Sequence, residues 1–316
     1  MRRHRAISVA LSSLGVVAGL SFSRAQAAPE TLRLAGPPTE DAVNASYAEK
    51  SGMFARADLD VEMIATASGT AATTAVIAGT YELARTSMMA VFTAHLRNIP
   101  IVVVAPHNLY STQNPFSLLQ IAADSPYKTG ADLSGKTIGS PALNDLNVLA
   151  TRAWVDKNGG DWRSLKFVEI PNAALEASIV AHRIDAAILQ LTQLDDSLAA
   201  GTTKTLGNPL AAIAPVFLAG VNVARGEWAT PHAESLRKLN RVLIDSGAYV
   251  NAHHAETVPL VVELTKMDPA NVTKMRRTIF APSLDIAMVQ PVIDAAARYG
   301  IIPRGFSARE LLWSDR

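Results

Sequence analysis

Hydroxyl and amide side chains stand at the ends of predicted strands, where they could hold a small polar ligand. They donate and accept hydrogen bonds without charge, and nearby helix starts would add free backbone N–H groups. This chemistry suits reversible capture of a small organic molecule better than covalent catalysis. The predicted ligand-binding residues are Pro38, Thr39, Ser68, Gly69, Thr70, Thr86, Ser87, Asn108, Tyr110, Ser140, Asn144, Asn147, Gln190 and Thr192.

Two of these segments are predicted helix starts, and together they favour an anionic ligand. The segments are 68–70 and 144–147, and both are expected to face a cleft. Free N–H groups and the positive ends of two helix dipoles would stabilise a sulfonate or a carboxylate. Arg85 could add charged donors, although a surface arginine on the rim of a sheet is the simpler interpretation. Asp145 is expected to cap its own helix instead of facing the ligand.

A neutral ligand such as a pyrimidine is the alternative class. It would be favoured by an acidic site with an aromatic cage. The aromatic residues available nearby are Tyr110, Phe116 and Trp154.

No enzyme signature accompanies these residues. The chain has no cysteine, which excludes disulfides, thiolate metal sites and a cysteine nucleophile. Serine-hydrolase, zinc-protease, phosphate-loop and dinucleotide motifs are also absent from the sequence. His253, His254 and Glu256 suggest a metal site, but adjacent helical residues point about 100° apart. We therefore predict a protein that is not an enzyme and needs no cofactor or metal.

Alternating strands and helices must position the polar residues. Strands are predicted over 31–35, 59–65, 81–85, 99–105, 165–170 and 185–189, and another follows the turn at 132–139. Helices are predicted over 41–51, 70–78, 144–157, 173–181, 231–253, 256–266, 269–277 and 284–299. Short connections between such units are typical of parallel-rich sheets covered by helices. In these sheets ligands bind beyond the carboxyl ends of the strands.

One helix–turn–strand pattern occurs twice, over 76–84 and again over 179–187. Each copy ends an amphipathic segment, turns, places one carboxylate and enters an apolar run. The repeat indicates two lobes built on one plan, although such junctions look alike in many α/β proteins. Two lobes imply a cleft between them, where small ligands commonly bind.

The first 27 residues are typical of a cleaved secretory signal. Arg2, Arg3 and Arg5 precede a short apolar run, and Ala25 to Ala27 forms a small-x-small cleavage pattern. Cleavage would leave 25 basic against 28 acidic residues, a near-neutral balance that gives no reason to bind nucleic acid. The later apolar run over 211–224 is interrupted and too short to span a membrane. We expect a monomer in the periplasm that is not membrane-anchored.

Four segments resemble periplasmic solute-binding proteins of the nitrate/taurine/alkanesulfonate type. SYAEKSGMFARADLDVEMI (46–64) looks like their opening helix and second strand, and TGADLSGKTIGSP (129–141) resembles the start of their second lobe. EASIVAHRIDAAILQ (176–190) resembles a later helix and strand of that lobe, and MVQPVIDAAARYGIIPRGFSARELL (288–312) their C-terminal helix and tail. The resemblance implies a two-lobe, type II binding-protein fold with a hinge, serving an ABC importer.

Three positions depart from that resemblance. Glu82 stands where aspartate is usual, and His182 stands where glycine is usual. Residues 189–193 (LQLTQ) replace an acidic-Pro-aromatic sequence. Because the last difference falls where ligand contacts are expected, the ligand cannot be copied from better-known members.

The predicted organisation is a signal peptide (1–27), lobe 1 in two parts (28–109 and 213–316), and lobe 2 between them (110–212). The predicted function is capture of a small organic ligand by hinge closure, followed by delivery to an ABC permease and its ATPase. A periplasmic enzyme that uses the same cleft and a ligand-binding partner of a membrane sensor are the alternatives.

Overall fold

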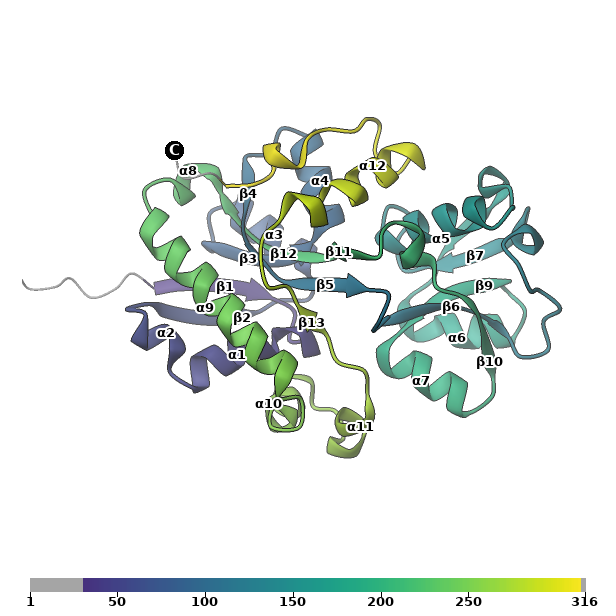
Figure 1. The fold of residues 1–316 in the computed structure, drawn as a ribbon, viewed down its shortest axis with the longest axis horizontal. Helices are drawn as coiled ribbons and strands as arrows, with labels where there is room; N and C mark the ends of the chain where they lie inside the picture. The colour runs from purple at the N-terminus through teal and green to yellow at the C-terminus, as the bar shows by residue number, and fades with distance from the viewer. Residues whose placement is uncertain (1–30, 314–316) are drawn as a thin grey trace, which may run out of the picture.

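Two sheets, each covered by helices, lie side by side and are joined by a smaller sheet (Figure 1). The structure is a computed structural model that describes residues 31–313. The predicted signal peptide lies outside the described residues. Within 31–313, none of the helices combines the length and the apolar character that a bilayer crossing requires.

Lobe 1 is the set of elements packed around the sheet β2-β1-β3-β12-β4. Its strands are β1 (Thr31–Gly36), β2 (Asp60–Ala65), β3 (Leu83–Ser87), β4 (Ile101–Pro106) and β12 (Gly220–Arg225). β1 pairs in parallel with β2 and β3, whereas β12 runs antiparallel between β3 and β4. The first helices are α1 (Val43–Lys50), α2 (Met53–Arg56), α3 (Gly69–Ile77) and α4 (Met88–Leu96).

Lobe 2 is the set of elements packed around the sheet β10-β6-β9-β7-β8. Its strands are β6 (Ser117–Ala122), β7 (Thr137–Ser140), β8 (Lys166–Glu169), β9 (Ala186–Gln190) and β10 (Thr203–Gly207). Its helices are α5 (Leu146–Lys157), α6 (Asn172–Val180) and α7 (Leu191–Ala199). β7 pairs in parallel with β8 and β9, so the carboxyl ends of these strands share one edge.

The connecting sheet β11-β5-β13 brings together three segments that are distant in sequence. They are β5 (Asn108–Ser111), β11 (Val216–Leu218) and β13 (Ile279–Phe280). Tyr110 is fully buried here and stacks on Phe217 with ring centroids 4.9 Å apart. Its hydroxyl donates to Asn208 Oδ1 at 2.8 Å. Tyr110 therefore belongs to the core between the lobes and not to a ligand surface.

The last third of the described chain is mainly helical. Its helices are α8 (Gly226–Ala229), α9 (Ala233–Ala252), α10 (Val258–Thr265), α11 (Pro269–Lys274) and α12 (Gln290–Arg298). α9 packs on α1 and β4 of lobe 1, while Tyr299 just beyond α12 donates to Asp156 of α5 at 2.8 Å. The C-terminal segment thus contacts both lobes, and the domain boundaries at 110 and 213 remain a prediction.

The mixed α/β fold predicted from the sequence is confirmed, although several helices differ from the prediction. The sequence did not predict the helices α2, α7 and α8. The predicted helix over 284–299 is divided into a short 3-10 turn (Ile286–Met288) and α12. Pro291 at the start of α12 has no N–H for an intrahelical bond, so it begins a helix well and continues one poorly. Helix α4 was not predicted, because its sequence MMAVFTAHL is almost wholly apolar and shows no polar face.

Candidate functional site

Two adjoining cavities lie at the carboxyl ends of the lobe 1 strands and reach lobe 2. The first is about 230 Å³ and is lined by lobe 1 residues and the start of β5. The second is about 210 Å³ and also touches Phe116 and Gln190 of lobe 2. Asp41 and Asn108 line both cavities. We call the two cavities together the cleft; its position is where open α/β sheets bind ligands.

Helix α3 presents its N-terminus to the cleft. Ser68 precedes the helix, and its hydroxyl accepts from the Ala71 N–H at 3.1 Å, so Ser68 serves as the cap. Gly69 packs closely on β3: a Cβ atom there would lie 3.1 Å from the Thr86 Cα atom. A side chain at Gly69 would push the helix away from β3. Gly69 and Thr70 therefore line the cleft through the first, positively polarised turn of α3.

Thr86 contributes a hydroxyl that has no partner. It is 6% exposed, and its Oγ1 atom forms no hydrogen bond within the protein. A Cβ on Gly69 would lie 3.2 Å from this oxygen, so Thr86 Oγ1 faces the start of α3. A buried hydroxyl without a partner carries a desolvation cost that a bound ligand would relieve.

Asp41 is the charged centre of the cleft. Its Oδ1 atom lies 2.7 Å from Arg85 Nη1, and its Oδ2 atom lies 3.2 Å from His107 Nε2. Arg85 also donates to the Pro37 carbonyl. Burial acts to raise the Asp41 pKa, but the Arg85 charge and the bonds from His107 and Thr39 outweigh it, so the pKa is well below its usual range. Asp41 is therefore ionised at neutral pH and neutralises Arg85.

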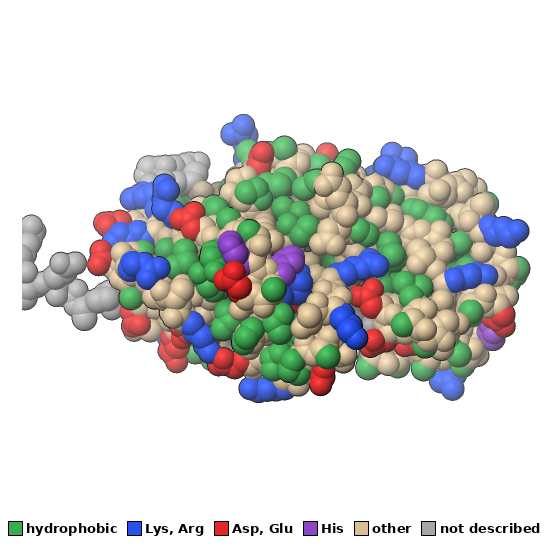
Figure 2. Space-filling view, turned by 60° about the horizontal axis from the view of Figure 1, so that its bottom comes forward, with side chains coloured by type: hydrophobic (Ala, Val, Ile, Leu, Met, Phe, Trp, Pro, Cys, Tyr) green, Lys and Arg blue, Asp and Glu red, His purple; other side chains and the backbone are tan. Residues whose placement is uncertain are grey.

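A second buried ion pair stands beside the first. Glu40 Oε1 lies 2.7 Å from Arg277 Nε, and both side chains are 4% exposed. The Thr278 N–H donates to Glu40 Oε2 at 3.2 Å, which fixes Thr278 at the edge of the cleft. Both guanidinium groups near the cleft are thus neutralised by carboxylates of the protein itself. On the face shown in Figure 2, acidic and basic side chains are interspersed.

Half of the predicted ligand-binding residues meet in the cleft. These are Thr39, Gly69, Thr70, Thr86, Ser87, Asn108 and Gln190. Their binding role remains a prediction.

The other predicted residues are placed differently. Pro38 lines a neighbouring, mainly apolar cavity of about 120 Å³ that shares Arg85 and His107 with the cleft, and Ser68 caps α3. Tyr110 lies in the core between the lobes. Ser140 donates to Asp145, and Asp145 Oδ1 accepts from the Val148 N–H at 3.0 Å, which confirms Asp145 as the cap of α5.

The start of α5 lines neither cavity of the cleft. Asn144 is exposed and Asn147 is buried, and both lie outside the cleft lining. The predicted convergence of the α5 and α3 starts on one ligand therefore stays a prediction. The side chain of Thr192 is outside the described part of the chain.

Glu40, Asp41 and Thr278 line the cleft but are not among the residues predicted from the sequence. Asp41 is the first residue of the helix predicted over 41–51, so it is not among the predicted ligand-binding residues. Position next to a predicted strand end was the signal that could have identified the two acids. Thr278 offers no such signal, because it reaches the cleft from a segment more than 200 positions after Glu40 and Asp41.

Burial of His107 should make stability depend on pH. Burial lowers the His107 pKa and outweighs the attraction of Asp41. Between this pKa and about 6.5, the unfolded chain binds a proton at His107 that the folded chain does not. The free energy of unfolding therefore has its full value above about pH 6.5. It decreases as the pH drops, by up to about 1.4 kcal/mol per pH unit. Urea unfolding from pH 5 to 7.5 should show this slope.

Replacing His107 by Gln should make that slope shallower. The exposed His182 provides the control, since its ring pairs with the exposed Asp124. His182→Asn should retain the wild-type slope, and Asn tolerates the positive φ of this position. An unchanged slope in His107→Gln would contradict the assignment.

Comparison with known proteins adds a family match and a fold match. The family model described as "NMT1/THI5 like" matches residues 41–257. Among solved structures, the periplasmic aliphatic sulphonate binding protein SsuA of Escherichia coli superposes with a TM-score of 0.74 at 14% identity, covering 91% of this chain and 93% of that one. The alkanesulfonate-binding protein SsuA of Xanthomonas axonopodis pv. citri, bound to MOPS, gives 0.70 at 17% identity, with 91% and 99% covered.

One curated protein shares detectable sequence similarity. The formylaminopyrimidine-binding protein of Halalkalibacterium halodurans is 28% identical over 139 residues, which are 44% of this chain. The match spans only 40% of that relative's length. The solved structures, at below 25% identity, establish the periplasmic binding protein fold.

Proposed function

The chain belongs to the NMT1/THI5-like family, and from this premise we propose that it is a solute-binding protein that captures a small organic ligand in the cleft. The observation that supports this best is the composition of the cleft wall, which combines Gly69, Thr70 and Thr86 of lobe 1 with Gln190 of lobe 2. A ligand held by both lobes would favour the closed arrangement of a hinge. The protein would act in the periplasm and deliver its ligand to an ABC permease and its ATPase.

The charges of the cleft support a neutral polar ligand over an anion. Arg85 and Arg277 each face a carboxylate of the protein at 2.7 Å, so neither is free to pair with a ligand. Donors remain at the start of α3 and on Thr86, and Asn108 and Gln190 can both donate and accept. The formylaminopyrimidine-binding relative is consistent with this class. A sulfonate or carboxylate, as first predicted from the helix starts, is the second candidate, because the α3 N-terminus faces the cleft.

Calorimetric titration can separate the two ligand classes. We expect a formylated aminopyrimidine to bind more tightly than an aliphatic sulfonate or carboxylate of similar size. Replacing Thr70 by Val should weaken binding by roughly 10- to 100-fold if its hydroxyl contacts the ligand, since a buried group left unpaired costs about 1–3 kcal/mol. Thr74→Val makes the same change at an exposed position of α3 that lines neither cavity, so it serves as the matched control and should leave affinity within about twofold. Equal loss in both variants, or tight binding of anions alone, would contradict the assignment.

Turnover would favour an enzyme instead. Incubation of the protein with the ligand that binds, followed by mass spectrometry of the ligand, should return it unchanged. A chemically altered product would show that the cleft is an active site.

A further inference from the structure

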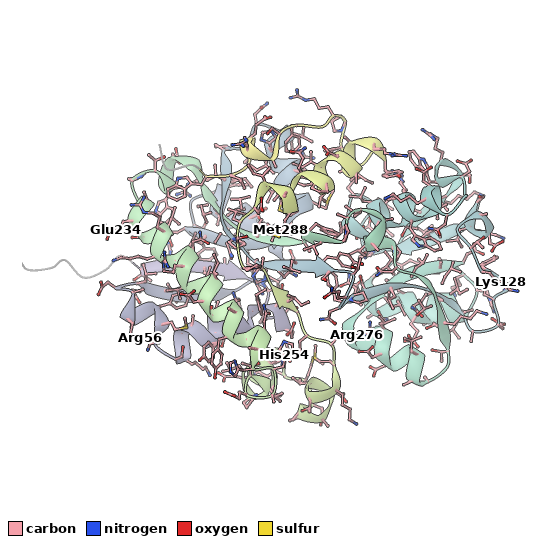
Figure 3. The ribbon with its side chains drawn as sticks, viewed as in Figure 1. Arg56, Lys128, Glu234, His254, Arg276 and Met288 are labelled. Atoms are coloured by element: carbon pink, nitrogen blue, oxygen red, sulfur yellow. The ribbon has the colours of Figure 1, made fainter. Side chains whose placement is uncertain are left out.

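The segment between α11 and β13 runs along the boundary between the lobes and contacts both of them. Figure 3 shows Arg276 at this boundary and His254 on the neighbouring part of lobe 1. Arg276, Arg277 and Thr278 follow one another here, and each has a different set of partners. We call residues 276–278 the strap.

Arg277 fixes the strap to lobe 1. Besides its pair with Glu40, it donates from Nη1 to the His254 carbonyl at 3.2 Å and from Nη2 to Thr257 Oγ1 at 3.2 Å. These bonds join the strap to the start of α1 and to the turn before α10. Because Arg277 and Glu40 are each only 4% exposed, the attachment is part of the core of lobe 1.

Arg276 points the other way, toward lobe 2. Its Nη1 atom donates to the Pro115 carbonyl at 3.0 Å, just before β6. Its Nε atom lies 3.4 Å from Asp195 Oδ1 on α7. Both side chains of this pair are about one-third exposed, at 32% and 33%. The bridge is therefore open to solvent and depends on the relative position of the lobes.

Thr278 connects this bridge with the cleft. It lines the cavity that also contains Phe116 and Gln190 of lobe 2. Its position is set by the bond from its N–H to Glu40. Rotation of lobe 2 away from lobe 1 would separate Arg276 from Asp195 and would open the same cavity.

We propose that Arg276 is a positioning residue that holds lobe 2 closed over the cleft by bridging the strap to Asp195 and Pro115. The inference rests on the proposed function, because closure matters for a protein that captures a ligand between its lobes. Arg276 does not contact the ligand and acts only by fixing the position of lobe 2 relative to lobe 1. An exposed ion pair is weak, and a hydrogen bond from a charged group adds to it. Together they should change the ratio of closed to open molecules by roughly threefold to tenfold.

The absence of cysteine allows a direct test of closure without any ligand. Asn271 on α11 and Ala199 on α7 are exposed and lie on opposite sides of the boundary. Cysteines introduced at both positions can carry spin labels, whose separation is measured by pulsed electron paramagnetic resonance. In Arg276→Met, the ratio of molecules with longer label distances to molecules in the closed form should rise roughly threefold to tenfold. Asp195→Asn should do the same to a smaller extent, because the bond to Pro115 remains.

The exchange of charges is the decisive variant. Arg276→Asp combined with Asp195→Arg should return the label distances toward those of the unmodified protein. Either of these substitutions alone should instead open the cleft. Lys50→Met, which breaks an exposed ion pair with Glu263 inside lobe 1, is the control and should leave the distances unchanged. Unchanged distances in Arg276→Met and Asp195→Asn, or no recovery in the exchanged pair, would overturn the proposal.

A second measurement distinguishes this inference from the proposed function. With a formylated aminopyrimidine as the probe, Arg276→Met should raise the dissociation rate constant roughly threefold to tenfold and change the association rate constant by less than about twofold. A loss of affinity caused only by slower association would overturn the proposed role of Arg276. If the probe does not bind the unmodified protein, the ligand assignment fails, while the distance measurement still decides the role of Arg276.

Discussion

Replacing Arg277 by Met is expected to lower the free energy of unfolding by about 3–5 kcal/mol. The substitution leaves the Glu40 carboxylate, which is 4% exposed, without its 2.7 Å partner. It also removes the donors to the His254 carbonyl and Thr257 Oγ1. A buried charge that loses its partner is among the most costly single changes in a folded protein. Urea unfolding at neutral pH measures the effect.

Two further variants identify its cause. Lys50→Met breaks an ion pair whose side chains are 43% and 59% exposed, so it should cost less than about 1 kcal/mol. Adding Glu40→Gln to Arg277→Met should recover part of the loss, because the uncompensated charge disappears. A cost below about 1 kcal/mol for Arg277→Met would show that the pair contributes little to the fold.

Replacing Asp41 by Asn should raise the affinity of the cleft for a monoanion by about tenfold or more. The Asp41 pKa lies well below its usual range, so its carboxylate cancels the Arg85 charge at neutral pH. The amide would leave the Arg85 guanidinium, which is 8% exposed, as the dominant charge beside the α3 start. Calorimetry with an aliphatic sulfonate on both proteins measures the change. Unchanged anion affinity would contradict the view that Asp41 sets the charge of the cleft.

The same substitution should also cost stability. Loss of a buried carboxylate typically costs about 3–5 kcal/mol, and the 26% exposure of the Asp41 side chain reduces this to about 2–3 kcal/mol. Urea unfolding of the ligand-free protein gives the value. A stabilised variant would mean that Arg85 is sufficiently held by the Pro37 carbonyl alone.

Local patterns made most of the fold predictable. The β-branched run in β4 and the cap at Asp145 each carry enough information within a few residues to fix a strand or a helix start. The resemblance to solute-binding proteins then supplied the arrangement of the elements in two lobes. Helix α4 could not be predicted, because an apolar helix that is buried on several sides has no polar face to reveal its period.

The site was only partly predictable, because its composition depends on contacts between distant segments. Thr86 and Ser87 directly follow the strand predicted over 81–85, and the structure places them at the carboxyl end of β3, where they line the cleft. The rule does not say how far a second lobe is rotated toward the first, so it could not show whether Asn144 and Asn147 would line the same cavities. Their binding role stays a prediction. Sequence position alone also gave no means of pairing Asp41 with Arg85, 44 residues later. That pairing changes the expected ligand from an anion to a neutral molecule.

Mass spectrometry of small molecules released from the purified protein is the most direct test of ligand capture between the lobes. Protein isolated from the cells that produce it and washed free of unbound solutes should release, on denaturation, one organic molecule in up to equal molar amount. That molecule should bind again to the ligand-free protein, and hydrogen exchange should then slow at Gly69 and Thr70 in lobe 1 and at Gln190 in lobe 2. Protection confined to one lobe, or to the apolar cavity beside Pro38, would contradict capture of the ligand between the lobes.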